Sequence, residues 1–150
     1  MSSKGGLFLD PTILPRWQSL LRWLRERAPL SILFSGGVDS LLVARAAAEA
    51  LSPSSVHLYC ILSDLDPPAV AERARRAAEA LNLPLREIPG RELEDPLLAS
   101  NPPHRCYLCR HRRHEALRQH PSWDPSSTLV DGTHADDQSE HRPGLRACEE

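Results

Sequence analysis

Apolar side chains recur three and four residues apart over residues 12–27, with arginine and glutamate on the opposite side. This spacing predicts an amphipathic helix that packs against a core and ends at Pro29. An interaction helix is the alternative interpretation of the same pattern.

The chain then alternates between apolar runs and helical patterns. Residues 30–34, 55–62 and 83–88 predict short buried strands, and residues 38–51 and 67–81 predict alanine-rich helices between them. This order predicts an α/β fold: a Rossmann-like parallel sheet with right-handed crossovers and helices on both faces. Residues 91–120 are interrupted by prolines and rich in cysteine and histidine, and a last short strand is expected at residues 127–130.

Composition narrows the class of protein. A chain of 150 residues fits one domain, and the net charge of −2 argues against a nucleic-acid-binding surface. The sequence shows neither a secretory signal nor an apolar run long enough to cross a membrane, so a cytoplasmic location is expected. Four cysteines in such a chain indicate reduced thiols or metal ligands more than disulfides.

The run Ser35-Gly36-Gly37-Val38-Asp39-Ser40 joins the first predicted strand to the following helix. The glycines permit a sharp turn close to an anion, and the helix N-terminus offers N–H groups to it. The two serines add hydroxyl donors, while Asp39 is suited to orient the loop or to hold a metal near phosphates. This pattern predicts a nucleotide-phosphate site that is neither GxxxxGK[ST] nor GxGxxG. A glycine turn that binds nothing is the alternative.

Two further groups carry candidate chemistry. The loop at residues 63–66 follows the second predicted strand and is expected to reach the nucleoside. Cys106 and Cys109 form a CxxC near three histidines, for which we consider zinc ligation, a redox dithiol with a pKa lowered by neighbouring arginines, and plain helix packing. Cys60 is expected to be a buried small hydrophobe.

The form SGGxDS resembles the pyrophosphate loop of the PP-loop ATP pyrophosphatases, which cleave ATP between the α and β phosphates and transfer the adenylyl group. Together with NPPHRCYLCR at 101–110 and DGTHADDQSEHRPGLRACEE at 131–150, it resembles the N-terminal portion of the LarE family. These are ATP-dependent sacrificial sulfur transferases of nickel-pincer nucleotide biosynthesis. The resemblance implies that ATP adenylates a substrate carboxylate, that a protein cysteine attacks it, and that its C–S bond then breaks.

The resemblance also implies roles for individual residues. Catalytic handling of phosphate and metal falls to Asp39 and Ser40, and Mg²⁺ accompanies ATP. Arg142 is expected to bind a substrate phosphate or carboxylate, a surface salt bridge being the alternative. Apart from the resemblance, the CxxC spacing makes Cys106 and Cys109 candidate ligands of zinc or an iron–sulfur cluster. The implied ATP-binding residues are Ser35, Gly36, Gly37, Val38, Asp39, Ser40, Asp131, Gly132 and Thr133.

One departure from the family pattern shapes the expectations about partners. Family members continue past the Arg-Pro-Gly segment into a half that carries the sulfur-donor cysteine, a role we do not assign to Cys148. We therefore expect a small nucleotide-like substrate, and a separate C-terminal half or a second copy of the chain as partner. The alternatives are another PP-loop enzyme, for tRNA thiolation or amidation, and a non-catalytic nucleotide-binding fragment.

Overall fold

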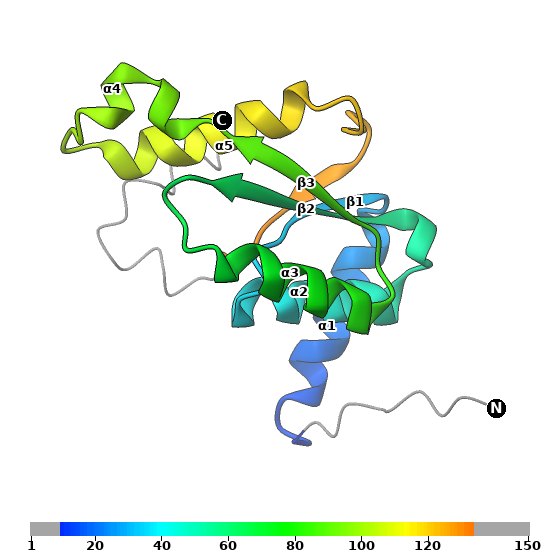
Figure 1. Ribbon diagram of the computed structural model, residues 1–150. Coiled ribbons are helices and arrows are strands. Elements are labelled where there is room, and N and C mark those ends of the chain that lie inside the picture. Colours follow the sequence, from blue (N-terminus) through cyan, green and yellow to red (C-terminus); the bar gives the residue numbers. More distant parts are fainter. Residues whose placement is uncertain (1–9, 134–150) are drawn as a thin grey trace.

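The computed structural model describes residues 10–133. Within them, four strands alternate with helices in the predicted order (Figure 1). The helices and strands are α1 (Leu14–Glu26), β1 (Leu30–Leu33), α2 (Val38–Ala50), β2 (Val56–Ser63), α3 (Ala69–Leu81), β3 (Leu85–Gly90), α4 (Pro96–Ala99), α5 (Arg105–Gln119) and β4 (Thr128–Val130), with short 3₁₀ turns at Pro53–Ser55 (η1) and Glu92–Glu94 (η2).

The strands form one parallel sheet in the order β3-β2-β1-β4. Leu30 at the start of β1 pairs with Val56 of β2 on one side and with Thr128 of β4 on the other. The predicted Rossmann-like sheet is therefore confirmed. Because all strands run the same way, their carboxyl ends lie along one edge, where open α/β sheets bind ligands.

Side chains along the strands alternate between two cores, one on each face of the sheet. Val56, Leu58 and Cys60 of β2 pack with α1, α2 and α3, whereas Tyr59 and Ile61 face α5. Figure 1 shows the first three helices on one side of the sheet and α4 and α5 on the other. Helices thus cover both faces, as predicted.

The structure corrects several sequence-based boundaries. Helices α1 and α3 each begin two residues later than predicted. Strand β3 begins at Leu85 and ends at Gly90, two residues later than predicted at each end, because Asn82 caps α3 in the left-handed conformation and is followed by a short link. Residues 105–119 form a continuous helix of 15 residues, which the cysteine- and histidine-rich composition did not predict. None of the helices in residues 10–133 is long and apolar enough to cross a membrane.

Candidate functional site

The segment between β1 and α2 forms a tight turn held by its own serines. Ser35 Oγ accepts a hydrogen bond from the Gly37 N–H at 3.3 Å, and Ser40 Oγ donates to the Gly37 carbonyl at 3.2 Å. Helix α2 begins at Val38, directly after this turn. Its first N–H groups lack intrahelical acceptors and carry the positive end of the helix dipole, which together make a site for an anion.

Gly36 is required by both backbone conformation and packing. Its φ of +69° lies in the left-handed region, and a Cβ placed on it would come within 2.9 Å of the Ala74 backbone in α3. Arg73, in the same helix, donates to the Ser35 carbonyl at 3.4 Å. The turn is thus fixed against α3, while its other side remains open.

The loop after β4 packs directly against the first turn of α2. A Cβ on Gly132 would lie 2.7 Å from the Ser40 backbone nitrogen and 3.0 Å from Asp39 Cβ, so no larger residue fits there. The adjacent Thr133 N–H donates to Asp131 Oδ1 at 2.9 Å. The structure therefore brings residues 131–133 to the phosphate loop, as the sequence resemblance implies.

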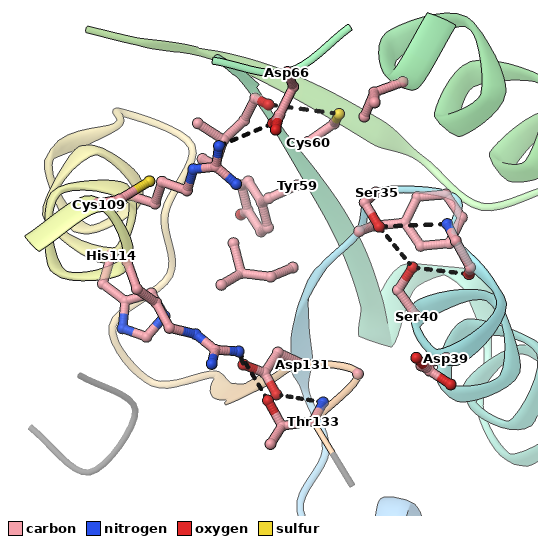
Figure 2. Close-up of a pocket in the computed structure, with 18 of the residues that line it drawn as sticks. Ser35, Asp39, Ser40, Tyr59, Cys60, Asp66, Cys109, His114, Asp131 and Thr133 are labelled. Atoms are coloured by element: carbon pink, nitrogen blue, oxygen red, sulfur yellow. Dashed lines mark hydrogen bonds and ion pairs between the residues drawn. The ribbon is translucent and has the colours of Figure 1, made fainter. Parts of the chain in front are cut away.

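A cavity of about 570 Å³ opens between this turn and α5. Ser35, Gly37, Asp39 and Ser40 line it. Figure 2 shows Ser35, Asp39 and Ser40 across the cavity from α5. The volume lies in the range of small-molecule sites. The side chain of Val38 points into solvent with 83% of its surface exposed, and Gly36 packs against α3, so any contribution from these two is through the backbone.

Helix α5 forms the opposite wall, and three of its arginines line the cavity: Arg105, Arg110 and Arg113. Arg110 contacts Asp131 Oδ2 at 2.6 Å and Thr133 Oγ1 at 2.8 Å. Arg113 contacts Asp66 Oδ2 at 2.9 Å. In Figure 2, Asp66 and Asp131 lie at opposite ends of the cavity, so each end holds one carboxylate paired with an arginine of α5.

A buried ion pair anchors the Arg113 end. The Arg113 Nε donates at 2.8 Å to Glu92 Oε1, whose side chain is 1% exposed. Burial raises the pKa of Glu92, but hydrogen bonds from Arg113 and Ser63 outweigh burial and hold the pKa below its usual range. Glu92 is therefore an ionised acceptor that fixes the Arg113 guanidinium.

The cysteines differ in environment, and one of the earlier expectations is wrong. Burial raises the pKa of Cys109, with Arg113 opposing and Glu92 reinforcing that shift, so the predicted lowering by neighbouring arginines does not hold for this thiol. Burial likewise raises the pKa of Cys60, which is the buried small hydrophobe expected from the sequence. Cys106 is exposed and lines the cavity together with Cys109.

Within residues 10–133, no group of three or more histidine, cysteine, aspartate or glutamate side chains is placed to hold a metal ion. The predicted zinc or iron–sulfur ligand set at Cys106 and Cys109 is thus not assembled by the described part of the chain. The cause is the continuous helix: His111, two residues after Cys109, turns to a different face and lies 3.6 Å from Glu115.

Thiol reactivity should follow these environments. Among the three cysteines of residues 10–133, we expect iodoacetamide to modify Cys106 first and Cys60 last in the native protein, because Cys60 has 1% of its surface exposed and needs local opening to react. Peptide mapping by mass spectrometry over a time course measures the order. Equal rates in denaturant provide the control, and early native modification of Cys60 would contradict the packing of β2.

The donor set at the phosphate loop fits Mg²⁺. This ion favours oxygen ligands, usually one or two carboxylates completed by phosphate oxygens and water. Asp39 and Asp131 supply carboxylates on either side of Gly132, and the loop serines supply hydroxyls. These residues would hold the ion, and its charge would offset that of the phosphates.

Sequence reasoning missed the supporting residues of the cavity. Glu92 and Arg113 had no motif to mark them, and the helical spacing of cavity-lining positions along α5 is the signal that would have found Arg113. Arg142 and Cys148 lie outside the described residues, and the substrate-binding role of Arg142 remains a prediction.

Comparison with known proteins gives relatives of greater length. The chain is 29% identical over 133 residues to an uncharacterized protein of Synechocystis sp., covering 89% of this chain and 49% of that protein. It is 26% identical over 139 residues to the pyridinium-3,5-bisthiocarboxylic acid mononucleotide synthase of Lactiplantibacillus plantarum, covering 93% of this chain and 50% of that protein. The chain thus spans about half the length of these relatives.

Among solved structures, the fold is similar to that of an NH3-dependent NAD synthetase from Campylobacter jejuni. The TM-score is 0.68 at 18% identity, over 87% of this chain and 59% of that chain. A family model described as asparagine synthase matches residues 18–128, which include the phosphate loop and the whole of α5. The chain therefore belongs to the asparagine synthase family, of the PP-loop ATP pyrophosphatase type.

Proposed function

We propose that this chain binds Mg-ATP and activates a substrate carboxylate by adenylation, with release of pyrophosphate. The observation that carries the proposal is the packing of Gly132 against the first turn of α2, which places two carboxylates and a helix N-terminus at one cavity. Family membership supports the use of ATP.

The cavity suits the charge changes of that reaction. A substrate carboxylate attacks the α-phosphorus, the bond to the β-phosphate oxygen breaks, and negative charge builds on the departing pyrophosphate. The N–H groups of the α2 N-terminus and the loop hydroxyls are positioned to stabilise this charge without rearranging. Arg110 adds a cation at the same end of the cavity.

A finer proposal concerns the fate of the acyl-adenylate. The relative in Lactiplantibacillus plantarum, named as a bisthiocarboxylic acid mononucleotide synthase, supports sulfur transfer to a nucleotide-like carboxylate. This step needs a donor thiol. We assign it to no cysteine of residues 10–133 and propose a separate partner chain as its source. Cys106 and Cys109 line the cavity, where their thiols are accessible to a bound substrate.

The proposal is tested by calorimetry of Mg-ATP binding. We expect Asp39→Ala to weaken binding by at least about tenfold, because it removes a charged oxygen ligand at the phosphate end of the cavity. Val38→Ala, at the neighbouring exposed position, is the matched control and should bind as the unaltered chain does. A folded chain that binds no Mg-ATP would overturn the proposal.

Amidation is a second candidate outcome for the acyl-adenylate. It is favoured by the name of the matching family and by the fold shared with an NH3-dependent NAD synthetase. Pyrophosphate release that depends on a carboxylate substrate supports either outcome. Transfer of label from ¹⁵N-ammonium to the product would favour amidation, and a thioacid product would favour sulfur transfer.

A further inference from the structure

The end of the cavity next to β2 carries a carboxylate that ATP activation chemistry does not use. Asp66 follows β2 in a turn fixed by two hydrogen bonds to Ser63: the Asp66 N–H donates to its carbonyl at 3.2 Å, and the Leu65 N–H donates to its Oγ at 3.0 Å. The Asp66 side chain is 32% exposed and lines the same cavity as the phosphate loop. It is therefore held in place and accessible to a bound ligand.

The side chain of Asp66 is held in position by Arg113, which is itself held by the buried Glu92. Glu92 holds the Nε of Arg113, and Arg113 Nη2 in turn donates to Asp66 Oδ2. An ionised carboxylate offers about four acceptor positions over its two oxygens, so the single contact to Arg113 leaves most of them available. Asp66 is thus an oriented acceptor facing a ligand cavity.

The fold dictates which part of a nucleotide lies near this acceptor. Phosphates at the α2 N-terminus are bounded on the β4 side by Gly132, which closes against Ser40. The nucleoside therefore extends toward the neighbouring strand β2, where Leu65 and Val70 give the cavity apolar surface for a base. Figure 2 shows Asp66 at this end and Asp131 at the other.

The chemistry of a carboxylate favours the ribose over the base. The edges of adenine alternate between the amino donor and ring-nitrogen acceptors, a pattern that suits an amide and repels the second oxygen of a carboxylate. Two neighbouring ribose hydroxyls instead present two donors. In dinucleotide-binding folds, an acidic residue after the second strand accepts hydrogen bonds from ribose in the same way.

We propose that Asp66, braced by Arg113 and Glu92, binds the ribose hydroxyls of the nucleotide and makes the site selective for ribonucleotides. This inference rests on the proposed binding of ATP and names a residue that sets the nucleotide specificity of that site. Arg113 is a positioning residue that acts through Asp66.

The test compares ATP with 2′-deoxyATP and 3′-deoxyATP by calorimetry at constant Mg²⁺ and salt. The unaltered chain should bind ATP about tenfold more tightly than at least one deoxy analogue, the lower limit expected for a hydroxyl bound to a charged acceptor. Asp66→Ala should bind all three nucleotides equally. The ratio of affinities is the readout, because removing a negative charge near a triphosphate also raises binding of every nucleotide.

Two variants and one analogue make the result specific. Asp64→Ala, in the same turn but outside the cavity lining, should keep the preference for ATP. Asp66→Asn keeps one acceptor oxygen and should keep part of the preference for ATP over the deoxy analogues. Purine riboside triphosphate, which lacks the amino group, should bind with the same relative affinity to the unaltered chain and to Asp66→Ala.

Three outcomes would overturn the inference. The unaltered chain could bind ATP and both deoxy analogues equally, or Asp66→Ala could keep the preference for ATP over them. The third is that the unaltered chain binds ATP more tightly than purine riboside triphosphate and that Asp66→Ala abolishes this difference. Each of them requires that ATP binds, so each leaves the proposed ATP site standing. Absence of ATP binding to the folded chain would instead overturn the proposed function and the inference together.

Discussion

Replacing Gly36 by alanine is expected to lower the free energy of unfolding by about 2–4 kcal/mol and to abolish Mg-ATP binding. Part of the loss comes from holding a side-chain-bearing residue at φ +69°, and part from a Cβ forced within 2.9 Å of the Ala74 backbone. A backbone neighbour in the middle of α3 cannot rotate away as a side chain would. The phosphate turn must therefore move away from α3, which displaces the α2 N-terminus.

Gly37→Ala is the matched control for this prediction. A Cβ at Gly37 would meet only the Ser35 hydroxyl, at 3.3 Å, and its φ of −72° suits any residue. Urea unfolding should find Gly37→Ala close to the unaltered chain in stability. Equal stability of the two variants would show that the contact between the turn and α3 does not constrain Gly36.

Sequence patterns predicted the scaffold because its signals are local. Apolar runs of strand length, alanine-rich helices and the glycine turn each lie within a few residues. Together they predicted the parallel sheet and the alternation of strands and helices that the structure confirms. The boundary of β3 was displaced because the cap at Asn82 carries no apolar signal. The phosphate loop was found for the same local reason, since its residues are contiguous.

Helix α5 was missed because its inward face is polar. Cavity-lining residues recur along it at helical spacing, at Cys106, Cys109, Arg110, Arg113 and His114, but periodicity searches count apolar residues. Its apolar contribution to the core is confined to the C-terminal turns, where Leu117 is fully buried. A helix that lines a cavity is therefore harder to recognise from sequence than one that covers a core.

The partners of Arg113 were unpredictable for a different reason. Asp66 and Glu92 lie 47 and 21 residues away in sequence, and only the packing of α5 over the ends of β2 and β3 brings them together. The sequence showed an arginine-rich segment, for which a solvated surface is the ordinary interpretation. One of these arginines, Arg113, instead lines the cavity and joins Glu92 to Asp66.

Arg113→Met is expected to destabilise the fold by about 3–5 kcal/mol, because it leaves the Glu92 carboxylate buried without its cation while keeping an apolar side chain of similar length. Arg112→Met is the matched control: Arg112 also binds two carboxylates, Asp95 and Glu115, but at the surface, so its loss should cost far less. Denaturant unfolding measures both. Similar costs for the two arginines would contradict a special role for burial. Arg113→Lys, which keeps the charge, should fall between them.

The pH dependence of stability distinguishes two causes of the loss in Arg113→Met: the missing ion pair with Glu92 and the altered packing around α5. In the unaltered chain the pKa of Glu92 is held below its ordinary value of 4.5, so its stabilising contribution is present above that pH and is lost as the pH falls through the lower, folded-state pKa. Without Arg113, burial dominates and the pKa of Glu92 rises. Protonation of the Glu92 carboxyl in acid then removes the free-energy cost of the buried, unpaired charge in the variant. The stability difference between Arg113→Met and the unaltered chain should therefore shrink as the pH is lowered from 7 toward 4. A difference that stays constant with pH would assign the loss to packing around α5 and not to the buried carboxylate.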